Sequence, residues 1–357
     1  MQLSDFDFAF DNTLIATHPV SPRHGSKMLC VKNGDISHHH TIDFVDFLNE
    51  NDCIVMNNTK VLKARLNGYV LTQGRSAKFE MTLHKFISND AHNVTYSTFI
   101  MNSRRLNIDD IVRFDYDKNT FIMAYIKHKD IDTGEVIVQF NTSLDNLYAF
   151  LDIAGMMPLP PYIASKRAVN VDDDDTYQSI FAQHLGSVAA PTASLHFDDI
   201  LMQKIKDKNI KTAFVTLHVG GGTFLPVKTY NINDHKMHSE MMSIDRQNAD
   251  IINQTKASGG RIIAIGTTAL RCLESAADKK GIVQAVTKDT DIFITPSYQF
   301  KMVDILLTNF HLPKSTLFML VCALCGTKTM HDAYAAAQEQ KYRFFSYGDS
   351  CLLFKAK

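Results

Sequence analysis

The sequence lacks a strong net charge and any long apolar run. Its 357 residues carry 37 Lys and Arg against 38 Asp and Glu, a formal net charge of −1. No global positive field indicates nucleic-acid binding, so an RNA partner would have to meet a local basic patch. The longest apolar run, Thr316 to Cys325, is far shorter than the roughly 20 residues of a membrane span. With no basic segment followed by an apolar stretch near the start, we expect a cytoplasmic protein without a membrane partner.

Cysteine is scarce and scattered, with 6 in the chain. This pattern is typical of reduced, buried thiols rather than of a disulfide framework. The segment from His235 to Glu240 reads His-x-x-His-x-Glu, which contains ligand types for a metal. Zinc-binding helices space their histidines four apart rather than three, so we expect no metal site. The same segment can instead place His238 and Glu240 on one strand face as an acid–base pair.

The pattern of apolar residues changes twice along the chain, and a chain of this length favours two domains. Residues 61–150 contain short runs in which apolar and polar residues alternate, which predicts an antiparallel β-barrel-like domain. In residues 1–60 and 151–357 strand patterns alternate with helix patterns, for which Asp198, Asp245 and Thr268 are predicted N-caps. This predicts an α/β main domain with a mixed sheet, into which the barrel is inserted.

Three predicted strands of the main domain are each followed by polar or glycine residues, where open α/β sheets bind ligands. His218 and the run Gly220-Gly221-Gly222 follow the first strand. Glycine lets the backbone approach a ligand such as S-adenosylmethionine, although a simple tight turn has the same composition.

The second segment holds Thr267 and Thr268 at a predicted helix start, which suits an anion. Arg271 and Glu274 follow at a spacing that allows them to pair. In the third segment Asn309 and His311 lie at a predicted strand end, where buried polar groups need hydrogen-bond partners.

These segments, in this order, closely resemble the S-adenosylmethionine:tRNA ribosyltransferase-isomerase family over nearly the whole chain. Ser194 stands where that family has glycine, and Leu225 where arginine is common. The blocks that carry the resemblance are Met1 to Phe8, Asn57 to Val61, Ala64 to Leu66, Leu159 to Ile163, Tyr177-Gln178, Gly186 to Ala193, Leu195 to Phe197 and Tyr342 to Asp349.

The resemblance implies a reaction on tRNA that carries 7-aminomethyl-7-deazaguanine at the wobble position. The ribosyl carbons of S-adenosylmethionine are transferred to the aminomethyl group and rearranged to give epoxyqueuosine, while adenine and methionine leave. It also implies an α/β domain paired with a barrel, and no metal or cofactor beyond S-adenosylmethionine as substrate. We expect a monomer.

The chemistry of this reaction suggests roles for individual residues. A general base must remove a proton beside the sulfonium, and His218, His238 and Glu240 are the candidates. His196 or His311 can assist the departure of adenine. The expected substrate-binding residues are Pro191, Thr192, Gly220, Gly221, Gly222, Thr223, Thr267, Thr268, Arg271, Glu274, Asn309, Tyr347 and Asp349, and the expected RNA contacts are Arg104, Arg105, Lys341 and Arg343.

Two other functions are compatible with the same residues. The glycine run taken alone suggests an S-adenosylmethionine-dependent RNA methyltransferase, which would leave S-adenosylhomocysteine rather than free adenine and methionine. Ser194 and Leu225 suggest an inactive relative that binds tRNA and releases no adenine.

Overall fold

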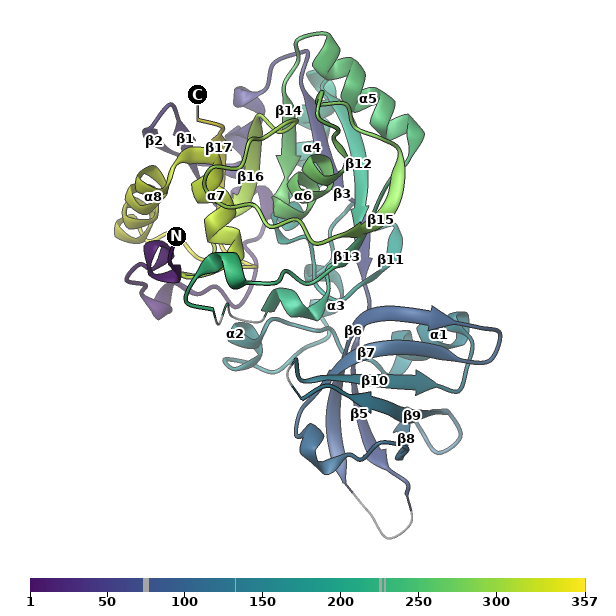
Figure 1. Ribbon diagram of the computed structural model, residues 1–357. Helices are drawn as coiled ribbons and strands as arrows, with labels where there is room; N and C mark the ends of the chain where they lie inside the picture. The colour runs from purple at the N-terminus through teal and green to yellow at the C-terminus, as the bar shows by residue number, and fades with distance from the viewer. Residues whose placement is uncertain (73–76, 132, 225–226, 228, 357) are drawn as a thin grey trace.

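The computed structural model describes residues 1–72, 77–131, 133–224, 227 and 229–356. It consists of an α/β domain and a smaller β-barrel, which lies below the α/β domain in Figure 1. This confirms the predicted fold class. None of the helices in the described ranges is long and apolar enough to cross a membrane.

The main domain is built on one nine-stranded mixed sheet. Its central strands β12, β3, β14 and β16 are parallel, so their carboxyl ends lie on one edge. The strands in spatial order are β15 (Val286–Thr290), β13 (Glu240–Ile244), β12 (Lys211–Leu217), β3 (Cys53–Asn57), β14 (Ile262–Ile265), β16 (Ile305–Asn309), β17 (Ser350–Phe354), β1 (Lys27–Lys32) and β2 (Asp35–His40).

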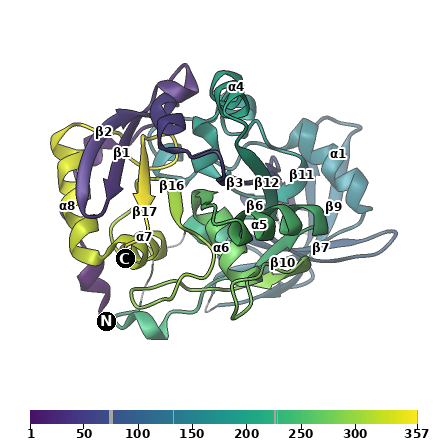
Figure 2. The same ribbon diagram turned by 90° about the horizontal axis from the view of Figure 1, so that it is seen from above.

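Helices cover both faces of this sheet (Figure 2). On one face α5 (Arg246–Ala257), α6 (Gly266–Ala276), α7 (Thr316–Cys325) and α8 (Thr327–Glu339) pack on strand residues such as Val55 and Ala264. On the other, α4 (Asp199–Asp207) and the 3-10 helices η4 (Thr41–Phe47) and η6 (Thr192–His196) pack on residues such as Ile54 and Ile263. Alternate strand residues therefore enter two separate cores, which is why these strands are almost wholly apolar.

Side-chain caps fix the starts of two of these helices as predicted. Asp198 accepts a hydrogen bond from the Leu201 amide, and Asp245 accepts one from the Asn248 amide. The predicted cap at Thr268 is wrong, because α6 already begins at Gly266. Gly266 has a φ of +86°, a conformation that residues with a Cβ rarely adopt. It starts the helix two residues earlier than the threonine.

The barrel occupies the segment from Arg65 to Phe140, inside the predicted range 61–150. Its six antiparallel strands close on one another in the order β10 (Glu135–Phe140), β7 (Val94–Ile100), β6 (Lys78–Asn89), β5 (Arg65–Val70), β8 (Ile111–Asp115) and β9 (Phe121–Lys129). Their inward residues form a core of their own, which α1 (Leu144–Ala154) completes. Among the described residues, closure pairs each barrel strand on both sides.

Short elements join the two domains and surround the carboxyl edge of the sheet. They are the paired strands β4 (Thr59–Val61) and β11 (His184–Ser187), the helices α2 (Pro161–Ala164) and α3 (Asp173–Thr176), and the 3-10 helices η1 (Leu3–Phe6), η2 (Asn12–Leu14), η3 (Arg23–Gly25), η7 (Gly221–Phe224) and η8 (Ile232–Asp234). A further 3-10 helix, η5 (Ser103–Arg105), lies within the barrel between β7 and β8.

Candidate active site

A cavity of about 520 Å³ lies at the carboxyl edge of the parallel strands. This is the place where open α/β sheets bind ligands, and its size suits a small molecule. Of the predicted site residues, those that line it are Pro191, Thr192, Thr267, Thr268, Asn309 and His311. In the described part of the chain, its lining includes none of the other predicted site residues.

The start of α6 forms one wall of the cavity. A Cβ on Gly266 would lie 3.4 Å from the Cβ of Ala193, which also lines the cavity. Thr267 and Thr268 follow in the first turn, where backbone N–H groups have no partner within the helix. The Thr268 hydroxyl is buried and finds no hydrogen-bond partner among the described residues. This wall therefore offers donors to an anionic or polar ligand group.

Asn309 lines the cavity and is held by His196. The Asn309 amide lies 3.1 Å from His196 Nε2 and donates to the Phe345 carbonyl, while its oxygen accepts from the Thr192 hydroxyl. The other ring nitrogen of His196 is 2.8 Å from the Ser26 hydroxyl. Burial lowers the pKa of His196 to about 3. A neutral ring with both nitrogens engaged positions Asn309 and is poorly suited to act as a proton donor.

His311 reaches the cavity directly. Its Nε2 lies 3.2 Å from the Thr308 hydroxyl, and its backbone N–H donates to the Tyr334 hydroxyl. Burial lowers the pKa of His311 to about 3. The ring is therefore neutral at pH 7 and can form hydrogen bonds to a ligand without carrying charge.

His218 follows β12, next to the cavity residue Val219. Its Nδ1 lies 2.7 Å from the Thr59 hydroxyl, and a Cβ on Gly186 would come within 2.9 Å of its ring. Burial, with a smaller contribution from His184, lowers the pKa of His218 to about 4. His218 is thus an uncharged imidazole fixed at one nitrogen.

Glu240 forms a buried ion pair with Arg271, and its other oxygen accepts a hydrogen bond from the Gly220 amide at 3.1 Å. The predicted pairing of Arg271 with Glu274 is wrong. Glu274 is fully buried and accepts from the Tyr298 hydroxyl and from three backbone amides, those of Lys301, Met302 and Val303. Among the described residues Arg271 Nε and Nη2 have no hydrogen-bond partner.

The glycine run is occupied by side chains rather than open to a ligand. A Cβ on Gly220 would lie 3.0 Å from the ring of His84, and one on Gly221 would lie 3.5 Å from Phe99. A Cβ on Gly222 would lie 2.7 Å from the ring of His238. His84 and Phe99 belong to the barrel, so these glycines permit close contact between the two domains. The side chain of Thr223, and Leu225, lie outside the described part of the structure.

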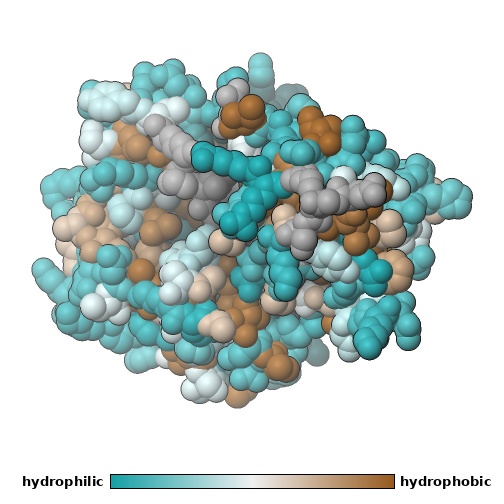
Figure 3. All heavy atoms as spheres, turned by 90° about the horizontal axis from the view of Figure 1, so that it is seen from below, coloured by the Kyte–Doolittle hydropathy of each residue, from teal (hydrophilic) through white to brown (hydrophobic). Residues whose placement is uncertain are grey.

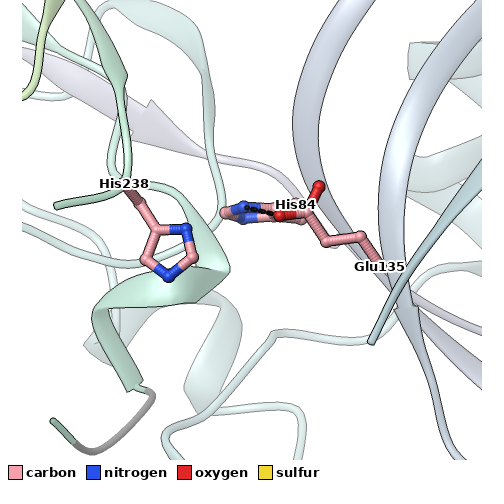
Figure 4. A group of neighbouring side chains, drawn as sticks. All are labelled: His84, Glu135 and His238. Atoms are coloured by element: carbon pink, nitrogen blue, oxygen red, sulfur yellow. Dashed lines mark ion pairs between the residues drawn. The ribbon is translucent and has the colours of Figure 1, made fainter. Parts of the chain in front are cut away.

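His84, Glu135 and His238 form a group at this contact (Figure 4), with ligand-type atoms within 4.8 Å of one another. His84 Nδ1 accepts a hydrogen bond from the Gly222 amide, and its Nε2 lies 3.8 Å from Glu135. Glu135 also accepts from Ser97. Because His84 already has partners at both nitrogens, the geometry fits a contact between the domains better than a metal centre.

The His-x-x-His-x-Glu segment does not converge on one point. His235 packs against Phe293, whereas His238 packs against His84. Glu240 begins β13, so His238 precedes the strand and does not share a strand face with it. The expected strand-face pairing of His238 and Glu240 is therefore wrong.

The carboxyl-terminal residues expected to bind substrate instead hold a loop. Tyr347 lies 3.3 Å from both Thr176 and Asp173, and Asp349 accepts from the backbone amides of Lys27 and Arg343. Their neighbours Phe345 and Ser346 line the cavity. Tyr347 and Asp349 thus position cavity residues.

The predicted RNA contacts lie on different domains. Arg104 and Arg105 are in η5 of the barrel and are exposed. Lys341 is exposed beyond α8, while Arg343 is half-buried and donates to the carbonyls of His18 and Tyr347. Figure 3 shows that hydrophilic residues cover much of the face seen from below.

Reasoning from the sequence missed the aromatic wall of the cavity, which we define as Tyr162, Tyr177 and Phe345. All three lie in the blocks that carry the resemblance. A signal was thus present, but nothing in their spacing showed that they share a surface.

A mixed sheet with a cavity at the carboxyl edge of its parallel strands, joined to a barrel that touches the same edge, defines a two-domain protein with room for a small molecule at that edge. The chain belongs to the family described as "Queuosine biosynthesis protein", which matches residues 3–353. It is 44% identical over 361 residues to the S-adenosylmethionine:tRNA ribosyltransferase-isomerase of Beijerinckia indica, covering 100% of this chain and 97% of the relative. The enzyme of the same name from Phenylobacterium zucineum is 46% identical, with both chains covered completely.

A solved structure supports the same assignment. The crystal structure described as S-adenosylmethionine tRNA ribosyltransferase from Thermotoga maritima matches with a TM-score of 0.53 at 28% identity. The match covers 98% of this chain and 99% of that one.

Proposed function

We propose that this enzyme transfers the ribosyl moiety of S-adenosylmethionine to 7-aminomethyl-7-deazaguanine at the tRNA wobble position and isomerises it, which gives epoxyqueuosine, adenine and methionine. The observation that carries the proposal is the cavity at the parallel-strand edge, in a chain that matches the family from residue 3 to residue 353. The reaction uses S-adenosylmethionine as a substrate and needs no further cofactor.

The start of α6 suits the methionine carboxylate. Gly266, Thr267 and Thr268 line the cavity, the first-turn N–H groups have no partner within the helix, and the Thr268 hydroxyl has none among the described residues. Arg271 lies one turn further along the same helix, and its positive charge is held by Glu240. We assign the carboxylate to this end of the cavity because a buried donor without a partner costs free energy that an anionic ligand can recover.

His218 is the strongest candidate for the general base. The sulfonium makes hydrogens on the adjacent ribose carbon acidic, so a neutral imidazole can accept one there while the electron pair stays on carbon. Thr59 fixes Nδ1 of His218, which leaves Nε2 for the proton. Glu240 is less suited, because one of its oxygens pairs with Arg271 and the other accepts from the Gly220 amide. His238 contacts the barrel instead.

The tRNA is expected to contact both domains. Arg104 and Arg105 on the barrel, with Lys341 on the main domain, offer exposed cations for phosphates. Because the substrate is a tRNA, we place the reaction in the cytoplasm. We further propose that the enzyme acts as a monomer, since one chain supplies both cores and the closed barrel offers no strand edge for pairing. Light scattering tests this.

The deciding experiment incubates the purified protein with S-adenosylmethionine and tRNA that carries the aminomethyl deazaguanine. The expected result is equimolar adenine and methionine and a nucleoside of the mass of epoxyqueuosine. Transfer RNA with guanine at the same position is the matched control and should release neither. Formation of S-adenosylhomocysteine would instead identify a methyltransferase. Binding of tRNA without adenine release would identify an inactive relative.

A further inference from the structure

Tyr177 stands out among the residues of the aromatic wall. It is 0% exposed and lines the cavity. Its hydroxyl has no hydrogen-bond partner within the described part of the chain. The hydroxyls of two neighbouring tyrosines are bonded inside the protein, that of Tyr162 to Ser346 and that of Tyr347 to Thr176. A buried hydroxyl without a partner, on a residue that lines a cavity, needs an explanation, and an acceptor atom of a ligand can supply one.

The hydroxyl is a hydrogen-bond donor at neutral pH. Burial, and then the neighbouring Tyr162 and Tyr347, raise the pKa of Tyr177 well above its usual value. The Ala190 amide and the Ser346 hydroxyl lie near enough to act in the opposite direction, but neither forms a hydrogen bond of good geometry with the Tyr177 hydroxyl. Tyr177 therefore keeps its proton. It needs a ligand atom that accepts a hydrogen bond.

The surfaces around Tyr177 suit a flat, uncharged ring. The rings of Tyr162 and Phe345 lie 4.9 Å apart and are tilted by 57°, and Pro161 and Ala190 add apolar surface. A purine base presents apolar faces to such walls and ring nitrogens that accept hydrogen bonds. The carboxylate of the same substrate is assigned to the start of α6, so the adenine end is left for the aromatic wall.

We propose that the Tyr177 hydroxyl donates a hydrogen bond to a ring nitrogen of the adenine of S-adenosylmethionine and assists its departure. This inference rests on the proposed function. When the bond between the ribose carbon and adenine N9 breaks, its electron pair moves onto the purine, and a hydrogen bond to a ring nitrogen becomes stronger. Adenine takes its proton from solvent after release, and Tyr177 keeps its own.

The test replaces Tyr177 by phenylalanine, which keeps the ring and removes only the hydroxyl. We expect kcat for adenine release to fall about 10- to 100-fold, with a smaller change in KM. We also expect the Tm of the ligand-free protein to stay the same or rise, because the variant removes an unsatisfied buried group. A hydroxyl with only a structural role would instead lower Tm and leave kcat unchanged.

Ser194→Ala is the matched control. Ser194 is also fully buried, and its hydroxyl also lacks a partner among the described residues, yet it is not among the residues that line the cavity. We expect Ser194→Ala to affect Tm in the same direction and to leave adenine release unchanged. Adenine release by Tyr177→Phe within twofold of wild type would overturn the proposal.

Substrate analogues test the same bond without changing the protein. S-adenosylmethionine made with 1-deazaadenine, 3-deazaadenine or 7-deazaadenine lacks one of the three ring nitrogens that can accept a hydrogen bond. One of the three analogues should react about 10- to 100-fold more slowly with wild type and lose its sensitivity to Tyr177→Phe. If all three analogues stay fully sensitive, the inference is wrong. A wild-type enzyme that releases no adenine from S-adenosylmethionine would contradict the proposed function itself.

Discussion

Replacing Glu240 by glutamine removes the charge that balances a buried arginine. Glu240 is 5% exposed and Arg271 is 6% exposed, and Arg271 Nε and Nη2 have no other hydrogen-bond partner in the described structure. Removing one partner of a buried ion pair costs about 3–5 kcal/mol. Glutamine can still accept from the Gly220 amide, so we expect the lower end, about 3 kcal/mol, or a more than 100-fold change in the folding equilibrium. Calorimetry should show a Tm lower by roughly 4 °C.

A double-mutant cycle separates the ion pair from general damage to the core. Arg271→Met removes the charge but keeps apolar volume, so the double variant with Glu240→Gln should be more stable than the sum of the single effects predicts, by about 1 kcal/mol or more. Glu274→Gln is the control, because that carboxylate lies on the same helix but bonds to backbone amides. It should show no coupling to Arg271→Met. A cost below about 0.5 kcal/mol for Glu240→Gln would refute the reasoning.

Three further predictions concern the site. His218→Ala should lower the single-turnover rate of adenine release by about 100-fold or more, while calorimetry should show unchanged binding of S-adenosylmethionine. Thr59→Val should lower the rate less. Equal rates for wild type and His218→Ala would exclude His218 as the base. Burial lowers the pKa of His196 and of His311 to about 3, so on acidification these histidines bind protons in the unfolded chain before they do so in the folded one. The free energy of unfolding should therefore fall as pH drops below about 6.5, by up to about 1.4 kcal/mol per pH unit for each histidine. A urea midpoint that stays constant from pH 7 to pH 5 would contradict this. Gly266→Ala places a Cβ on a residue of the cavity wall whose φ is +86°. It should lower the free energy of unfolding by about 1–2 kcal/mol and weaken binding of S-adenosylmethionine. Gly34→Ala is the control, because Gly34 has a φ of +90° and open space around it, so it should show the same strain and no loss of binding.

The sequence was sufficient to predict that polar residues gather at the carboxyl edge of the parallel strands. Strands of the parallel core are recognisable as short apolar runs, and their carboxyl ends share an edge by geometry alone. Thr267, Asn309 and His311 could therefore be placed near one another before any coordinates were known. The N-caps Asp198 and Asp245 could also be predicted from the sequence, because a cap depends only on residues of its own helix.

Contacts between distant segments could not be read in this way. Arg271 has Glu274 three residues ahead, a spacing that allows pairing on any helix, yet it pairs with Glu240 because β13 lies beside α6. The glycine run suggests a place for a ligand, but glycine by itself indicates only that space is needed. Which neighbour uses that space depends on how His84, 138 residues from Gly222, is brought to it by the barrel.

The close fit of His84 of the barrel against Gly220 and His238 of the α/β domain also limits how the enzyme can be recombined. A chimera that takes its barrel from one relative and its α/β domain from another must inherit a compatible imidazole and a compatible glycine from different parents. A bulkier residue at the position of His84 or of Gly220 would push the barrel away from the α/β domain beside His218. Exchange of barrels between distant members is therefore expected to succeed only when the strand that carries His84 and the loop after β12 are exchanged together.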